Sequence, residues 1–259
     1  MTEATAPYSL LTFAPMVDSE TCRFVLKHYA IHYRERPHTF GWCSVLALGR
    51  CGTLRVPAFH GRKLRLAGPR ALVEHFDRSC PTQQMLLPSQ QPLRIQVERD
   101  WERYNGYLAL HSAVVAYFHL LPHREIMIEP FFRGVPEREA RLFRGAYPFL
   151  GGLLTVLLQL GEGKAKDSLT RIRMLFEATD MRLRDDRPYL AGDRVTLGDF
   201  GLAAAAAPLL LPSGYGSPIP PLDRMPNDYS MIVKEMRQHP TAAFVQRIYD
   251  RHYTTPPAV

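Results

Sequence analysis

Cysteine, long apolar runs and an amino-terminal leader are what this sequence has least of. It has 4 cysteines in 259 residues and no CxxC pair, which predicts reduced thiols rather than a disulfide framework. Residues 1–8 lack a charged segment followed by an apolar one, so we expect no signal peptide. The longest apolar run, residues 202–211, is about half as long as a membrane span. These absences predict a soluble, cytoplasmic protein without a membrane partner.

Motifs for binding phosphate, metal or nucleic acid are missing as well. Neither GxGxxG nor P-loop spacing occurs. The histidines have no metal-like spacing with cysteines or carboxylates, so we expect no metal. The net charge of +7 would suit nucleic acid, but no basic helix is interleaved with aromatic residues. We therefore expect small anionic ligands and no nucleic acid.

Length and composition are those of a globular protein. The 259 residues are enough for two domains with their own cores, and 46% hydrophobic with 22% charged residues excludes a disordered or fibrous chain. Residues 1–80 hold most of the basic excess, with 11 Lys/Arg against 6 Asp/Glu.

The most informative stretch is residues 53–77. Val56-Pro57 precedes a short apolar run, His60-Gly61 offers a two-residue turn, residues 63–66 alternate, and Gly68-Pro69 opens a helix. The pattern predicts strand, hairpin, strand, helix. On the residues alone this is a plain hairpin with a trans turn proline, or a strand entered through a cis Val56-Pro57 bond.

A strand and a helix precede this stretch. Residues 8–13 are β-prone and end before Pro15, and Asp18 or Ser19 is a good N-cap for the helix that follows. Residues 30–33 lead into a second strand. Residues 37–52 predict a long connection that contains a short helix.

The remainder of the chain has helical periodicity. After a polar, proline-bearing linker, the pattern predicts helices over residues 93–122, 136–160 and 164–184, the second weakened by its two central glycines. Thr196 and Asp199 have the spacing of a capping box at the start of a further helix.

Several of these segments, in order, carry a resemblance to a known family. The sequence resembles the cytosolic glutathione S-transferases over roughly residues 8–253. The run from Arg187 to Phe200 resembles the start of a core helix in the second domain of that family. In the amino-terminal part the matching segments are Phe13-Ala14-Pro15, Arg23 to Leu26, Ile31 to Tyr33, Val56-Pro57 and Ala71-Leu72. The resemblance implies a thioredoxin-like α/β amino-terminal domain (residues 1–80), a linker (81–92) and an all-α carboxy-terminal domain (93–259). It also implies a homodimer.

The resemblance leaves two functions open. One is an enzyme that transfers glutathione to an electrophilic, apolar small molecule, or isomerises or reduces it, with glutathione as co-substrate. The other is a non-catalytic binding protein of the same fold with a degenerate glutathione site.

The expected glutathione site is incomplete. The resemblance implies that Pro57 is cis, that the backbone of Val56 meets glutathione, and that Arg70 and Ala71 lie at the same site. In the family an acidic residue and a serine hold the γ-glutamyl end, but here Gly68-Pro69 stands in their place. Because proline lacks an amide hydrogen and glycine lacks a side chain, we expect weak glutathione binding.

The residue that would activate the thiol is also altered. The resemblance places Thr12 where some members carry a catalytic tyrosine, and Met16 near where others carry serine or cysteine; Ser19 is a second candidate hydroxyl. The alternatives are that Thr12 is an ordinary strand threonine and that Ser19 or Asp18 caps the helix.

A pocket for the apolar substrate is expected against the first carboxy-terminal helix. The resemblance suggests Met16, Tyr104, Tyr107 and His111 as its lining residues. The alternative is that the aromatic side chains belong to an ordinary core between the domains.

Overall fold

The amino-terminal part of the chain forms an α/β unit. A computed structural model describes residues 7–217 and 219–253, so the expectation for residues 1–8 lies mostly outside the described residues. The elements are β1 (Ser9–Thr12), α1 (Val17–His28), β2 (Arg34–Pro37), α2 (Trp42–Cys51), β3 (Ala58–Gly61), β4 (Leu64–Ala67) and α3 (Gly68–Phe76). The predicted βαβ-ββα order is confirmed.

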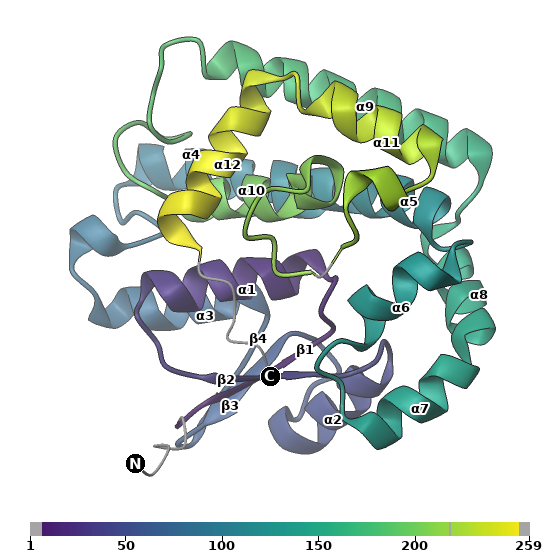
Figure 1. The fold of residues 1–259 in the computed structure, drawn as a ribbon. Coiled ribbons are helices and arrows are strands. Elements are labelled where there is room, and N and C mark those ends of the chain that lie inside the picture. The colour runs from purple at the N-terminus through teal and green to yellow at the C-terminus, as the bar shows by residue number, and fades with distance from the viewer. Residues whose placement is uncertain (1–6, 218, 254–259) are drawn as a thin grey trace.

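The four strands make one mixed sheet in the order β2-β1-β3-β4. β1 runs parallel to β2 and antiparallel to β3, and β3 pairs antiparallel with β4. α1 and α3 pack against each other, and α1 also packs on α10. Figure 1 shows both helices between the sheet and the carboxy-terminal helices. The face of α1 that points away from the sheet is therefore covered by the carboxy-terminal helices.

The β3-β4 turn lies two residues later than predicted. Gly61 is the last residue of β3 and pairs with Leu64, so the turn consists of Arg62 and Lys63, with φ values of 45° and 67°. The glycine serves a close approach instead, because an added Cβ would lie 2.3 Å from the carbonyl oxygen of Pro7. The sequence pattern correctly singled out Gly61 as structurally important, but the prediction that it forms the turn is wrong.

The start of α1 also differs from the prediction. The N-cap residue is Met16, whose side chain makes no capping hydrogen bond. The Ser19 hydroxyl instead donates to the carbonyl oxygen of Phe13, at 2.9 Å. The prediction that Asp18 or Ser19 caps this helix is wrong, because the helix begins before them.

The rest of the described chain is mostly helical. Its elements are two short 3-10 turns (Asp77–Ser79 and Thr82–Gln84), α4 (Gln91–Trp101), a π-helical segment (Glu102–Leu108), α5 (Ala109–Leu120), α6 (Arg124–Phe132), α7 (Glu137–Gly145), α8 (Tyr147–Leu158), α9 (Glu162–Arg182), α10 (Leu197–Leu210), a 3-10 turn (Leu222–Arg224), α11 (Asn227–Met236) and α12 (Pro240–His252). The helix predicted at residues 164–184 is confirmed.

The helix predicted at residues 136–160 is two helices. The break falls at Ala146, not at the central glycines, and Pro148 lies in the first turn of α8, where its missing amide hydrogen costs nothing. The Tyr147 hydroxyl donates to the carbonyl oxygen of Leu121, at 2.8 Å, and fixes α8 against the end of α5. Tertiary contact therefore places the break.

α10 is the central helix of the molecule. All its residues are buried, and it packs against α1, α4, α5, α11 and α12. Its first turn approaches α4 so closely that a Cβ on Gly198 would lie 2.8 Å from that of Asp100. The low helix propensity of this glycine is thus offset by the close packing that it allows.

A capping box opens α10, as the sequence predicts. The Asp199 carboxylate accepts hydrogen bonds from the backbone amide and the hydroxyl of Thr196, both at 2.7 Å, and from the amide of Leu190, at 2.7 Å. The same carboxylate therefore joins the helix start to the preceding loop.

We expect Thr196→Ala to lower the free energy of unfolding by about 1 kcal/mol, the usual value of a helix cap. The substitution removes the hydroxyl that the buried carboxylate accepts from. Urea denaturation followed by circular dichroism measures the change. The matched control is Thr170→Ala on the exposed side of α9, where the hydroxyl bonds only within its own helix. Equal midpoints for the two variants would contradict the capping role.

One hydrophobic core runs through both parts of the chain. Phe24 of α1 stacks on Phe200 of α10 with ring centroids 5.0 Å apart, and meets Tyr249 of α12 edge-on at 4.9 Å. The α/β unit and the helical part therefore share apolar packing, which holds the residues between them in defined positions.

Candidate functional site

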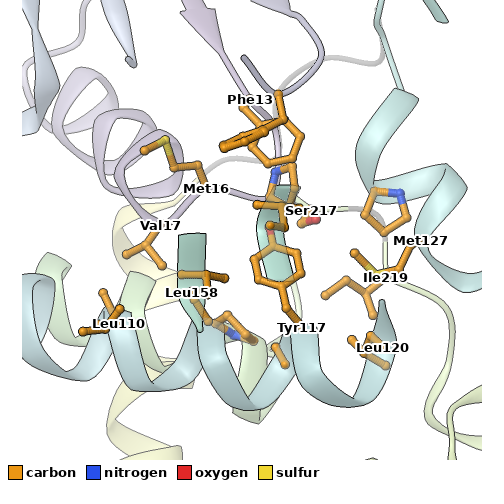
Figure 2. Close-up of a pocket in the computed structure, with 18 of the residues that line it drawn as sticks. Phe13, Met16, Val17, Leu110, Tyr117, Leu120, Met127, Leu158, Ser217 and Ile219 are labelled. Atoms are coloured by element: carbon orange, nitrogen blue, oxygen red, sulfur yellow. The ribbon is translucent and has the colours of Figure 1, made fainter. Parts of the chain in front are cut away.

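A cavity of about 360 Å³ lies where the end of β1 and the start of α1 meet the helical part. Its walls come from the β1-α1 turn, α5, α6, α8 and the segment after α10. Figure 2 shows Phe13, Met16 and Val17 on one side and Tyr117 with Leu120 of α5 on another. Almost all of the lining side chains are apolar, so the cavity suits an apolar molecule of moderate size.

One carboxyl group lies on this wall. Asp18, in the first turn of α1, accepts a hydrogen bond from the side-chain amide of Asn105, at 2.9 Å. Burial raises the pKa of Asp18, and the hydrogen bond from Asn105 only partly opposes that shift. No Lys, Arg or His is among the described residues that line the cavity.

The two candidate catalytic hydroxyls are buried and already bonded. Thr12 donates to Oε1 of Glu35, at 2.8 Å, and Ser19 donates to the carbonyl oxygen of Phe13, at 2.9 Å. Both residues have zero solvent exposure. Since each hydroxyl proton is held by a protein acceptor, neither is free for a bound thiol. Their catalytic role stays a prediction that the geometry does not favour.

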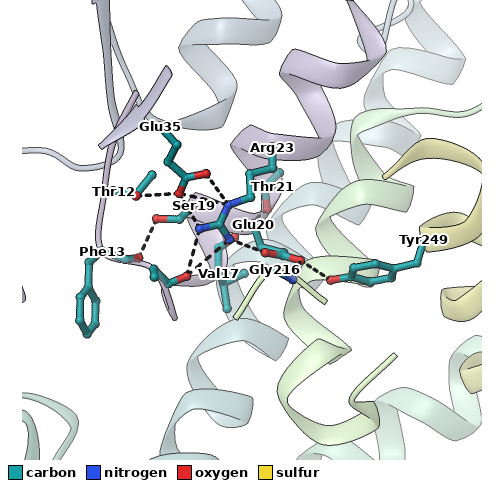
Figure 3. Close-up of polar contacts among 11 residues, drawn as sticks. Thr12, Phe13, Val17, Ser19, Glu20, Thr21, Arg23, Glu35, Gly216 and Tyr249 are labelled. Carbon is teal, nitrogen blue, oxygen red and sulfur yellow. Dashed lines mark hydrogen bonds and ion pairs between the residues drawn. The ribbon is translucent and has the colours of Figure 1, made fainter. Parts of the chain in front are cut away.

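The acceptor of Thr12 belongs to a buried ion cluster, defined here as Glu20, Arg23 and Glu35 (Figure 3). The Arg23 guanidinium donates to both carboxylates and is 3% exposed. Glu20 also accepts from the amide of Gly216, at 3.0 Å, and from the hydroxyl of Tyr249, at 2.9 Å. The cluster therefore ties α1 to the segment after α10 and to α12.

Of the four predicted pocket residues, Met16 lines the cavity. Tyr104 does not, because it is fully buried and its hydroxyl shares a hydrogen bond with Thr179 of α9, at 3.0 Å. Its ring belongs to the core under α9.

Tyr107 and His111 also lie away from this cavity. Tyr107 is 40% exposed and accepts a hydrogen bond from Arg171, and His111 is buried with Nδ1 at 3.0 Å from the Ser168 hydroxyl. The π-helical segment before α5 changes the residues per turn, so a periodicity of 3.6 carried through it assigns the wrong face. Leu110, Ala113 and Tyr117 line the cavity instead.

Two of the residues expected at a glutathione site, Val56 and Pro57, lie at the end of the sheet. The Val56-Pro57 bond is cis, which confirms that prediction. Leu11 pairs with Ala58, so Val56 and Pro57 run beside Thr12 and Phe13, next to the cavity. Neither the amide nor the carbonyl of Val56 has a hydrogen-bond partner within the described part of the chain. This backbone edge is open to a ligand.

The neighbouring start of α3 is less open. Arg70 pairs with Glu74, at 2.8 Å, and with Glu98, at 3.1 Å, so its guanidinium is already neutralised. Ala71 follows it in the first turn of α3. Gly68 has a φ of +80° and donates its amide to the carbonyl oxygen of Pro57, at 2.8 Å. Whether Arg70 and Ala71 contact glutathione stays a prediction.

Sequence reasoning missed much of the cavity wall. Ser217 and Ile219 lie in the connection between α10 and α11, and Leu154 and Leu158 belong to a helix whose packing partner the sequence does not show. The one signal for this wall in the sequence was the composition of α8. The helix is apolar on every side, which indicates that more than one of its faces packs against other parts of the protein or a ligand.

Two kinds of feature are absent from the described residues, 7–217 and 219–253. No group of three or more His, Cys, Asp or Glu side chains is placed to hold a metal ion. No helix in that part of the chain has both the length and the apolar character to cross a membrane.

Sequence comparisons with known families and with curated proteins find no match. Solved structures do match. A glutathione S-transferase from Sinorhizobium meliloti shares 18% identity and a TM-score of 0.55, covering 97% of this chain and 96% of that one. One from Methylobacillus flagellatus with glutathione bound shares 15% identity and a TM-score of 0.58, covering 94% of this chain and 95% of that one. One from maize, in complex with an atrazine glutathione conjugate, shares 18% identity and a TM-score of 0.54, covering 95% of this chain and 93% of that one. The chain therefore has the glutathione transferase fold, as the resemblance implied.

Proposed function

We propose that this protein binds an apolar small molecule in the cavity between the α/β unit and the helices, with little or no glutathione transfer. The observation that carries the proposal is the cavity of about 360 Å³ with nearly all-apolar walls. Such a space lies within the range of small-molecule sites.

The chemistry around the cavity favours binding over transfer. A glutathione thiolate needs a donor beside it, but the hydroxyls of Thr12 and Ser19 donate to protein oxygens. The carboxyl of Asp18 lies at the same helix start, where its negative charge opposes a thiolate. The chain thus keeps a substrate-sized space and lacks the usual means of activating a thiol.

The second candidate is the glutathione transferase activity that the resemblance implies. The unpaired backbone of Val56 favours it, because this edge lies beside Phe13 of the cavity wall and can accept and donate hydrogen bonds. Activation would then rest on the backbone amides at the start of α1. A homodimer is a further expectation, which light scattering coupled to size-exclusion chromatography measures.

The neutral fluorescent probe N-phenyl-naphthylamine tests the binding function. We expect it to bind the wild type, and Ala113→Phe, which fills the cavity from α5, to weaken it at least about tenfold. Ala178→Phe, on the exposed side of α9, is the matched control and should bind as the wild type does. Equal affinities for the two variants would place the probe elsewhere and overturn the proposal.

Conjugation of glutathione to chlorodinitrobenzene, followed by absorbance, tests the second candidate. The first proposal expects a rate equal to the uncatalysed background. Turnover above background would establish the transferase instead. Its loss in Thr12→Ala or Ser19→Ala would then identify the activating hydroxyl, and persistence in both would assign that role to the backbone amides.

A further inference from the structure

The wall of the cavity contains a hydroxyl that has no hydrogen-bond partner among residues 7–217 and 219–253. Ser217 is 3% exposed and lines the cavity, and its Oγ has no hydrogen-bond partner among the described residues. Buried hydroxyls are usually paired, because an unpaired one loses its bonds to water without replacement. This serine is therefore positioned for a partner that enters the cavity.

Tyr117 adds a second polar group to the same space. In Figure 2 its ring extends from α5 toward Phe13 and Ser217. Its hydroxyl makes no hydrogen bond to any described side chain or backbone atom, and burial raises the pKa of Tyr117, which keeps the phenol neutral. Both hydroxyls can donate to an oxygen on a ligand.

The charge of the cavity wall restricts that ligand further. Asp18 is the one carboxyl group among the described lining residues, and no basic side chain accompanies it. An anionic ligand would lose its hydration and meet no cation. A neutral oxygen avoids this cost.

The position of Ser217 is set from outside the cavity. The preceding residue, Gly216, donates its amide to Glu20 of the buried ion cluster, and a Cβ at this glycine would lie 2.8 Å from Nη1 of Arg23. The cluster thus holds the segment close to α1. The residue before the serine is therefore hydrogen-bonded to α1.

Building on the proposed function, we propose that the cavity selects neutral, largely apolar molecules that carry a carbonyl or ether oxygen, with Ser217 as the specificity-determining donor. Carboxylates of the same size are excluded. The hydroxyl of Tyr117 assists, and the apolar side chains around it bind the hydrocarbon part of the ligand.

Three naphthalenes of similar size test the selection by displacement of N-phenyl-naphthylamine: acetylnaphthalene, ethylnaphthalene and naphthoate. For the wild type we expect acetylnaphthalene to bind about fivefold more tightly than ethylnaphthalene, the effect of one net hydrogen bond, and naphthoate to bind weakest. Ser217→Ala should remove the advantage of the ketone over the hydrocarbon while leaving the affinity for ethylnaphthalene unchanged.

The matched control is Ser112→Ala. Ser112 is also buried, and its hydroxyl has no partner in the part of the chain that the structure describes, but it does not line the cavity. This variant should therefore keep the preference for the ketone. Naphthoate binding as tightly as acetylnaphthalene, or a ketone preference that survives Ser217→Ala, would overturn the inference while leaving the binding function intact. Failure of every ligand and of the probe would instead contradict the proposed function.

Discussion

Replacing Arg23 by methionine is expected to lower the free energy of unfolding by about 3–5 kcal/mol, the cost of removing one partner from a buried ion pair. The side chain of Arg23 is 3% exposed and that of Glu35 is 6% exposed. Nε and Nη2 donate to Glu35 at 3.0 and 2.6 Å, and Nη1 pairs with Glu20. Methionine fills similar space but leaves two carboxylates buried without a cation.

Guanidinium denaturation of the variant and of Arg171→Met separates this effect from loss of an ordinary ion pair. Arg171 pairs with Asp167 on the exposed surface of α9, where such pairs contribute little to stability. Adding Glu20→Gln and Glu35→Gln to Arg23→Met should recover much of the loss, because the amides are neutral and still accept hydrogen bonds. A loss no larger than that of Arg171→Met would show that the cluster is not fully desolvated.

This cluster also shows what the sequence could and could not predict. The strand and helix order followed from local patterns: apolar alternation, turn residues, and the capping-box spacing of Thr196 and Asp199. The role of Arg23 did not, since its partner Glu35 is 12 positions away and Gly216, which donates to Glu20, is 196 positions from that residue in sequence. Such contacts depend on packing between elements.

The candidate site was predicted least well for the same reason. Met16 lines the cavity, as the resemblance implied, and Val56 lies beside Phe13 at the end of β1. The role of Val56 toward glutathione stays a prediction. Nothing local indicates that Ser19 turns back to the carbonyl of Phe13, or that Ser217 lines the cavity. The π-helical segment also changes which residues of α5 point into the cavity, and a periodicity of 3.6 residues per turn cannot predict that change.

The Gly68→Glu, Pro69→Ser double variant is expected to bind glutathione on the order of a hundredfold more tightly than the wild type. In the glutathione transferases that the sequence resembles, an acidic residue and a serine at these positions hold the γ-glutamyl ammonium and carboxylate. Here Gly68 offers no acceptor side chain, and Pro69 offers neither hydroxyl nor amide hydrogen. Arg70 does not compensate, because Glu74 and Glu98 already neutralise it.

Backbone strain acts on folding rather than on this affinity. Gly68 has a φ of +80°, so any side chain there costs about 1–2 kcal/mol of stability. An added Cβ has no atom within 4 Å, so the strain is conformational and not a clash. Once the variant is folded, its affinity for glutathione reports the restored contacts.

Calorimetric titration with glutathione compares three proteins: the wild type, the double variant, and Gly68→Ala, Pro69→Ala. The alanine pair carries the same strain and restores the amide of residue 69, but has neither carboxylate nor hydroxyl. We expect it to gain far less than the glutamate-serine pair. Equal gains would assign the effect to the amide alone, and micromolar affinity in the wild type would show that Val56 and the start of α3 suffice to hold glutathione.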